Sequence, residues 1–134
     1  MAMTLQIPPN CDLTLGLVCV DKSTPGTTVW KMRADERFLN PAGIVQGGFI
    51  AAMLDSAMGA SAVTGLRGRS ASVANTEMKV TFLRSARTGD SLTCTATVLK
   101  PGSVVTFVAA RVVDDQGQVV ATASSTYLIK DRQE

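Results

Sequence analysis

Apolar and polar residues alternate with a period of two through much of the chain after residue 72, a pattern that predicts β-strands. The alternation is regular in residues 78–82 and 92–98, whereas residues 104–113 are apolar on both sides, as in a central strand. Residues 119–129 form a last stretch rich in Ala, Ser and Thr. Gly, Pro and Asp separate these stretches, so we expect four antiparallel strands joined by turns.

The first half of the chain predicts two more strands and a helix. Residues 17–23 and 27–34 flank a Pro-Gly turn and indicate a hairpin. After a loop at residues 40–43, a helical stretch runs from Gln46-Gly47-Gly48 to near Gly65. The predicted fold class is α+β, with one long helix packed across one face of a curved antiparallel sheet.

The predicted helix is apolar around almost its whole circumference, with Phe49, Met53, Met58 and Val63 on different sides. A helix of this kind has no face for solvent. We expect it to be covered by the sheet, by a partner subunit or by both.

Length and composition indicate a single domain, residues 1–134, with enough apolar material for a core, because 46% of the residues are hydrophobic and 18% are charged. A net charge of +2 without a basic patch argues against nucleic-acid binding. Polar residues interrupt the most apolar stretch, and the N-terminus lacks the features of a signal peptide, so we expect no membrane association. Three widely spaced cysteines fit neither a disulfide framework nor a zinc site and suggest a reducing cytoplasm.

The chain contains no histidine. This excludes Ser-His-Asp and Cys-His catalysis as well as histidine-ligated metals. We therefore expect chemistry based on carboxylates, hydroxyls, amides, thiols or cations, with no metal and no cofactor.

Asp55 is the one charged residue between Arg37 and Arg67, and it lies in the middle of the apolar helix. An ionised carboxylate is costly to bury without partners, and proteins that hold one in such a place commonly use it. A salt bridge or a cap to a neighbouring element is the structural alternative. Asp55 is thus a candidate catalytic carboxylate.

Gly47 and its neighbours at the helix start offer a second candidate site, because free N–H groups and the positive end of the helix dipole meet there. Glycines let an oxygen approach those donors, as an oxyanion site requires, although a simple tight turn is the alternative. At ~1.5 Å per residue, Gly47 and Asp55 lie about 12 Å apart along the helix, too far to serve one carbonyl. If both act, they come from two chains, which predicts a homodimer with sites at the interface.

The segment from Asn40 through Gln46-Gly47-Gly48 to Asp55, together with 78–84, Gly89-Asp90 and 115–121, resembles the hotdog-fold acyl-CoA thioesterases of the phenylacetate-pathway type. That family shows an Asn, then His-Gly-Gly, then an acidic residue along the helix. The resemblance covers most of the chain. It implies a hotdog fold and hydrolysis of a small aryl- or acyl-CoA thioester to the free acid and CoA, by a homodimer, with a dimer of dimers left open.

The resemblance also implies roles for individual residues. Asp55 matches the carboxylate that acts as nucleophile or general base, and Gly47 matches the residue whose N–H polarises the thioester carbonyl. Asn40 matches an Asn that positions the water or the thioester. Asn75 falls where the family often has a Ser or Thr that orients the water, although a turn residue at a strand start is as good an interpretation.

Coenzyme A carries several phosphate charges, so cations are expected around the mouth of the pocket. Each of them could equally be a solvated surface charge. The expected substrate-binding residues are Gln46, Gly48, Arg67, Arg69, Arg84 and Lys100. Apolar side chains such as Phe49, Met53, Met58 and Phe82 would set the acyl specificity, and they fit a plain core equally well.

Gln46 departs from the family pattern, which has His at this position. A Gln amide can still hydrogen-bond to the loop, yet the change motivates an alternative, an acyl-CoA binding protein without catalysis. A hotdog hydratase or dehydratase fits poorly, because those enzymes generally use a catalytic His.

Overall fold

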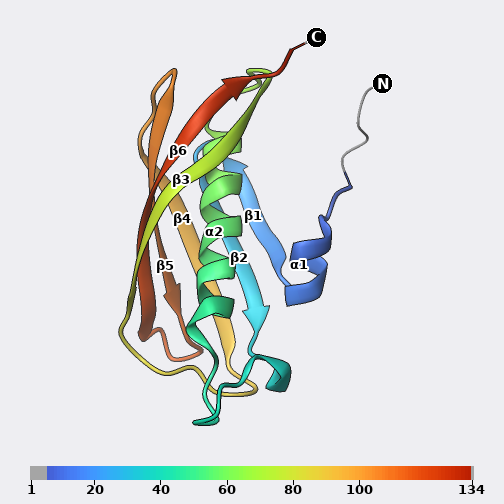
Figure 1. Cartoon of the computed structure of the whole chain (residues 1–134), viewed down its shortest axis with the longest axis vertical. Helices are drawn as coiled ribbons and strands as arrows, with labels where there is room; N and C mark the ends of the chain where they lie inside the picture. The colour runs from blue at the N-terminus through green and yellow to red at the C-terminus, as the bar shows by residue number, and fades with distance from the viewer. Residues whose placement is uncertain (1–5, 134) are drawn as a thin grey trace.

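A six-stranded antiparallel sheet curves around one long helix, α2, in the computed structural model, which describes residues 6–133 (Figure 1). The strand order across the sheet is β1-β2-β4-β5-β6-β3, so β1 and β3 are its edges. The strands are β1 Val18–Thr24, β2 Thr27–Arg33, β3 Ala71–Phe82, β4 Ser91–Lys100, β5 Val105–Val113 and β6 Val119–Asp131. The predicted hotdog architecture is confirmed.

Two short helical elements do not follow from the hydrophobic pattern. α1 spans Asn10–Leu15 and contacts α2, and the 3-10 helix η1 spans Glu36–Phe38. α1 ends at Gly16, whose φ of 67° lies in the left-handed region that glycine adopts readily. Elements this short do not complete enough turns to show a helical period, so the sequence pattern could not predict them.

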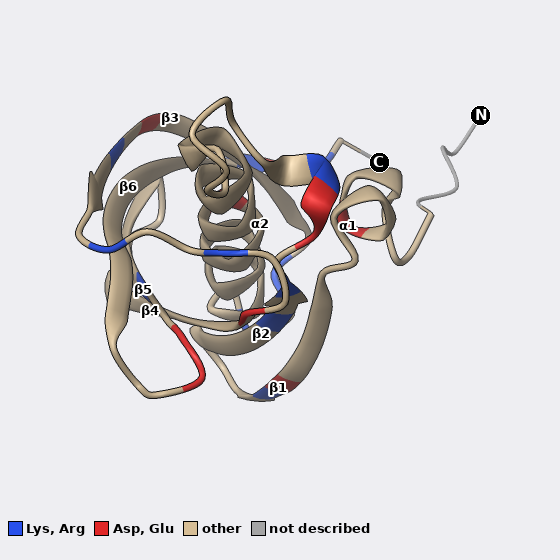
Figure 2. Cartoon of the chain, turned by 90° about the horizontal axis from the view of Figure 1, so that it is seen from below, with Lys and Arg blue, Asp and Glu red and all other residues tan. Residues whose placement is uncertain are grey.

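Helix α2 spans Gly47–Thr64, and the sheet covers only one side of it. Figure 2 looks along the helix and shows the sheet curving around it. The buried side consists of Ile50, Met53, Leu54, Ala57, Met58, Ser61 and Ala62. The opposite side is a stripe of mostly small residues at three- or four-residue spacing, none of them buried: Gly48, Ala52, Asp55, Gly59 and Val63. The expectation of a fully covered helix is therefore not met by the single chain, because these residues remain partly or fully exposed.

A chain of hydrogen bonds ties the buried side of α2 to the sheet. Trp30 Nε1 donates to Thr28 Oγ1 at 2.9 Å, the Thr28 and Ser61 hydroxyls lie 2.7 Å apart, and Ser61 Oγ donates to the Ala96 carbonyl at 2.9 Å. Either hydroxyl can be the donor between Thr28 and Ser61, because each also has a main-chain carbonyl as an acceptor, that of Ala57 at 3.1 Å from Thr28 and that of Ala96 for Ser61. These hydrogen bonds link α2 to β2 and β4 and fix the position of the helix along the two strands.

Replacing Ser61 with Ala removes the central link of this chain. We expect Ser61→Ala to lower the free energy of unfolding by about 1–2 kcal/mol, because buried partners lose a hydrogen bond. Urea denaturation at one fixed protein concentration measures this, and Ser124→Ala, at an exposed position of β6, is the matched control. Equal stability of the two variants would show that the chain of hydrogen bonds does not stabilise the fold.

Candidate active site

The carboxylate of Asp55 is held from one side by two residues of the sheet. Its Oδ1 atom accepts hydrogen bonds from Asn75 Nδ2 and from Tyr127 Oη, both at 2.9 Å. Oδ2 has no hydrogen-bond partner among residues 6–133, and Asp55 is exposed on the open stripe. The structure thus orients the carboxylate through one oxygen and leaves the other free toward the uncovered side of α2.

Tyr127 is the single tyrosine of the chain and is 3% exposed. Its hydroxyl also lies 3.0 Å from the main-chain oxygen of Asp55. Burial, reinforced by the Asp55 carboxylate, raises the pKa of the Tyr127 hydroxyl well above its usual range, so the hydroxyl remains a donor at neutral pH. Sequence reasoning missed this residue. The available signal was a lone tyrosine on the inward face of the last strand, where a buried hydroxyl needs a partner.

Asn75 reaches Asp55 because β3 contains a β-bulge. Asn75 pairs with Tyr127 and Glu77 pairs with Thr126 across β6, so Thr76 is an extra residue. The bulge shifts the alternation by one position and re-aims the side chains before and after it. Asn75, predicted near the reacting centre, therefore contacts the candidate carboxylate directly.

The amide of Asn75 is only partly satisfied. Its Nδ2 also lies 3.2 Å from Ser125 Oγ and 3.4 Å from Tyr127 Oη. Its Oδ1 is buried and has no partner within the described part of the chain. Because a carboxylate can only accept, Nδ2 must face Asp55.

The first turn of α2 presents the free N–H groups that the sequence predicts. Within residues 6–133, the N–H groups of Gly47 and Gly48 meet no acceptor, and the N-cap residue Gln46 makes no side-chain cap. A Cβ on Gly47 would come within 2.9 Å of the Phe82 ring, whereas a Cβ on Gly48 would meet open space. Gly47 thus lets the ring pack against the helix start, and two donors remain available to an oxyanion.

Asn40 shapes the loop that leads to this turn. Its Oδ1 accepts hydrogen bonds from the Ala42 and Ile44 N–H groups at 3.0 and 3.3 Å, and its own N–H donates to the Ile44 carbonyl. The side-chain oxygen of Asn40 is therefore used inside the loop. Its amide N–H groups are the part that a substrate could reach.

The four predicted cations lie in three different settings. Arg69 donates from Nε to Asp131 at 2.8 Å and from a terminal nitrogen to the Ser103 carbonyl, so it ties the end of β6 to the β4–β5 turn. Arg67 follows α2, and Lys100 ends β4; both are exposed. Arg84 lines a separate polar hollow together with acidic residues that include Asp90. The structure does not gather the four at one point of a single chain.

The buried cysteine of the core is not an alternative nucleophile. Burial raises the pKa of the Cys94 thiol to about 12, so this cysteine is a poor nucleophile. No group of three or more His, Cys, Asp or Glu residues that could hold a metal occurs in the described part of the chain. Over the same residues, no helix is both long and apolar enough to cross a membrane.

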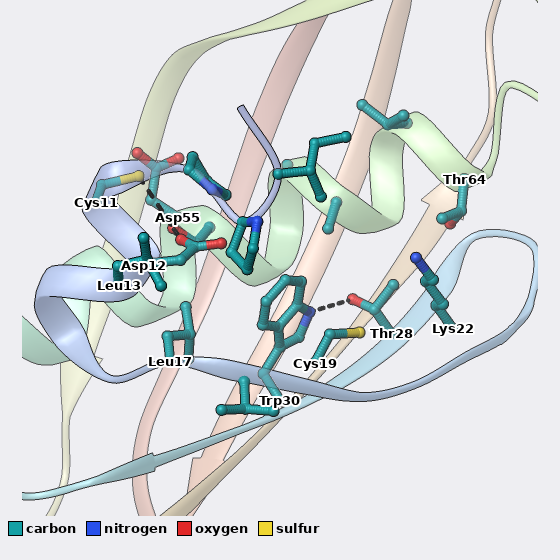
Figure 3. A pocket seen from close by; sticks show the side chains of 18 of the residues that line it. Cys11, Asp12, Leu13, Leu17, Cys19, Lys22, Thr28, Trp30, Asp55 and Thr64 are labelled. Atoms are coloured by element: carbon teal, nitrogen blue, oxygen red, sulfur yellow. Dashed lines mark hydrogen bonds between the residues drawn. The ribbon is translucent and has the colours of Figure 1, made fainter. Parts of the chain in front are cut away.

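A hollow of about 850 Å³ opens beside Asp55, between α1, β1, β2 and α2 (Figure 3). Its wall is mostly apolar and includes Leu17, Cys19, Trp30 and Val63. The apolar residues proposed for acyl specificity lie elsewhere: Met53 and Met58 are fully buried core, and Phe49 stacks on Phe38. None of the three lines the hollow, because Met53 and Met58 belong to the covered side of α2 and Phe49 packs on η1 from the first turn of the helix.

Comparison with known proteins agrees with this fold and identifies the family. The model of the family described as thioesterase superfamily matches residues 42–121, which include Gly47, Asp55 and Asn75. Acyl-coenzyme A thioesterase 13 of Homo sapiens is 28% identical over 98 residues, which are 73% of this chain and 69% of the human protein.

Two solved structures show the same fold. A phenylacetic acid degradation-related protein from Ralstonia eutropha JMP134 is 34% identical with a TM-score of 0.80, over 90% of this chain and 89% of that one. A hypothetical thioesterase protein from Streptococcus pneumoniae TIGR4, solved with coenzyme A, is 16% identical with a TM-score of 0.79, over 88% of this chain and 91% of that one. The predicted resemblance to hotdog-fold thioesterases of the phenylacetate-pathway type is confirmed, and the chain belongs to the thioesterase superfamily of thioester hydrolases.

Proposed function

We propose that the protein hydrolyses a small aryl- or acyl-CoA thioester to the free acid and coenzyme A, at a site shared by two subunits. One observation carries the proposal: the Asp55 carboxylate is fixed through Oδ1 by two donors while Oδ2 points free on the uncovered stripe of α2. This arrangement suits a catalytic carboxylate, because two donors fix its orientation while the second oxygen stays open to a substrate or a water.

A second subunit would complete the site. Gly47 and Asp55 are separated by about 12 Å of rigid helix, so one chain cannot bring both to one carbonyl. The open stripe of α2 is lined by small residues, and the twelve-residue strand β3 has a free edge beside it. Unpaired edges and open helix faces favour association with another chain. A twofold pairing would place the helix start of each subunit near the Asp55 of the other.

The proposed reaction uses only groups of this chain and water. The Gly47 N–H polarises the thioester carbonyl and stabilises the oxyanion. Asp55 Oδ2 either takes a proton from an attacking water, or bonds to the carbonyl carbon and expels the thiolate, after which water hydrolyses the resulting anhydride. In both routes water adds to the acyl carbon, the C–S bond breaks, and the products are a carboxylic acid and a thiol. Asn75 and Tyr127 keep Asp55 in position throughout.

The coenzyme would be held by cations near the helix ends. Arg67, Arg84 and Lys100 have no ion pair within residues 6–133, so they remain available for phosphate groups. Arg69 is engaged with Asp131 and is the weakest of the four predicted contacts. The coenzyme A bound to the similar fold from Streptococcus pneumoniae supports this choice of carrier.

Asp55→Asn keeps the size of the side chain and an oxygen for both donors, but it removes the negative charge. We expect kcat to fall roughly a thousandfold with the fold intact, as for loss of a catalytic base. Release of free thiol from a panel of aryl-, short- and long-chain acyl-CoAs measures this. Asp21→Asn, which changes an exposed residue of β1, should retain full activity.

Two outcomes would contradict the proposal. Undiminished turnover by Asp55→Asn would remove this carboxylate from the chemistry. Tight binding of acyl-CoA by the unmodified protein in calorimetry, with no thiol released from any substrate, would favour the binding protein that Gln46 suggests.

Tyr127→Phe tests the positioning of Asp55, since the ring stays and only the hydroxyl is lost. We expect kcat to fall about ten- to a hundredfold with little change in KM, because a hydrogen bond to a charged group contributes roughly 1.5–3 kcal/mol. In the Asp55→Asn background the same change should cost almost nothing more. Equal losses in both backgrounds would mean that Tyr127 acts through the fold instead.

A further inference from the structure

A second carboxylate, that of Asp12, lies in the wall of the same hollow and, unlike Asp55, is buried. Asp12, on α1, is only 5% exposed, and it lines the hollow together with Asp55. Its Oδ1 accepts a hydrogen bond from Ser56 Oγ at 3.0 Å, with the Cys11 thiol at 3.7 Å as a weak second donor. No cation pairs with Asp12 among the residues that the structure describes, and its Oδ2 makes no hydrogen bond there.

An ionised carboxylate with so few donors is poorly compensated for its burial. A single hydroxyl satisfies a small part of what the two oxygens can accept. The remaining acceptor capacity faces a hollow of about 850 Å³, a size that suits a small-molecule ligand. Asp12 is therefore placed to accept a hydrogen bond from whatever enters the hollow.

The position of Asp12 along the hollow determines which part of a bound substrate must carry the hydrogen-bond donor. Ser56 follows Asp55 directly on α2, and the hydrogen bond between Ser56 and Asp12 keeps the two carboxylates at the same end of the hollow. Figure 3 shows Asp12 and Asp55 at this end, while Thr28, Lys22 and Thr64 lie at the other. A substrate whose reacting carbonyl is at Asp55 would therefore meet Asp12 with the first carbons of its acyl chain.

The rest of the hollow suits an alkyl chain. Its lining along α2 runs from Asp55 to Thr64, a length of about 13 Å at 1.5 Å per residue. Trp30 and Cys19 form part of the wall beyond the carboxylates, and the Trp30 indole N–H is already used by Thr28. That part of the wall offers an apolar surface with its polar atoms satisfied.

We infer that the hollow receives the acyl chain of the substrate and that Asp12 selects chains with a hydrogen-bond donor close to the thioester, of which β-hydroxyacyl thioesters are the class. The inference rests on the proposed function, because it takes Asp55 as the place where the carbonyl reacts.

A comparison of three thioesters tests the inference: octanoyl-CoA, β-hydroxyoctanoyl-CoA as both enantiomers, and ω-hydroxyoctanoyl-CoA. We expect kcat/KM to be about tenfold higher for one β-hydroxy enantiomer than for octanoyl-CoA, as one charge-assisted hydrogen bond allows. The ω-hydroxy compound should gain no advantage that depends on Asp12. Asp12→Asn should lower the ratio of kcat/KM for the preferred β-hydroxy compound to that for octanoyl-CoA several-fold, and Asp12→Ala should bring this ratio to about one.

Ser56→Ala separates recognition from a purely structural contact between α1 and α2. If Asp12 binds the substrate, Ser56→Ala keeps the β-hydroxy preference, because the carboxylate remains. If Asp12 only holds α1 in place, Ser56→Ala is as harmful as Asp12→Ala, and both affect all three substrates equally. Asp21→Asn controls for removal of a carboxylate elsewhere on the protein.

The outcomes for this inference and for the proposed function are distinct. Turnover of octanoyl-CoA without any β-hydroxy preference, or a preference that survives Asp12→Ala, overturns the role of Asp12 and leaves the thioesterase proposal standing. Failure to turn over any thioester overturns the proposed function. In that case calorimetry still tests the role of Asp12. The Kd values of β-hydroxyoctanoyl-CoA and octanoyl-CoA are compared in the unmodified protein and in Asp12→Ala, and their ratio decides whether Asp12 binds the acyl chain.

Discussion

The fixed distance between Gly47 and Asp55 on α2 is the constraint on which the proposed site depends. A rigid α-helix keeps the amide donors of Gly47 about 12 Å from the carboxylate of Asp55, and no side-chain motion can close that gap. In the proposed reaction each chain therefore contributes two half-sites, one at the start of α2 and one at its middle. A second chain that supplies the missing half is the proposed explanation for the uncovered stripe of α2, the free edge of β3 and the unpaired Oδ2 of Asp55.

Most of the fold could be predicted from the sequence because its elements are long. Six strands, marked by period-two alternation, by apolar runs or by the turns between them, and one continuous apolar helix leave few arrangements other than a sheet wrapped around a helix. The place of Asp55 in the middle of this helix was also predictable, because a lone charge in an apolar helix is conspicuous. The open stripe was not, because a side chain that is apolar in sequence, such as Val63, does not reveal which side of the helix the sheet leaves uncovered.

The surroundings of Asp55 depend on contacts that no local pattern encodes. Tyr127 and Asn75 meet the carboxylate only because β6 and β3 pair in a register that includes an extra residue at Thr76. Asp12 enters the same hollow through a helix of six residues, which is too short to leave a periodic signal. The hollow itself is built from α1, β1, β2 and α2, so its size and polarity follow from packing rather than from sequence order. The hollow therefore contains two carboxylates, those of Asp12 and Asp55, of which the sequence predicted one.

Mixed dimers test the shared site most directly. Gly47→Pro deletes the N–H donor, and Pro suits the first helical position after Gln46, whose ψ of 130° is extended. Gly47→Ala places the same Cβ against Phe82 but keeps the N–H, so it is the control.

Dimers that combine one Asp55→Asn subunit with one Gly47→Pro subunit are purified through two different tags, and thiol release is measured. With both parent dimers inactive, the account predicts about half the turnover of the unmodified dimer, because one of the two sites regains both groups. Mixed dimers no more active than their parents would contradict it.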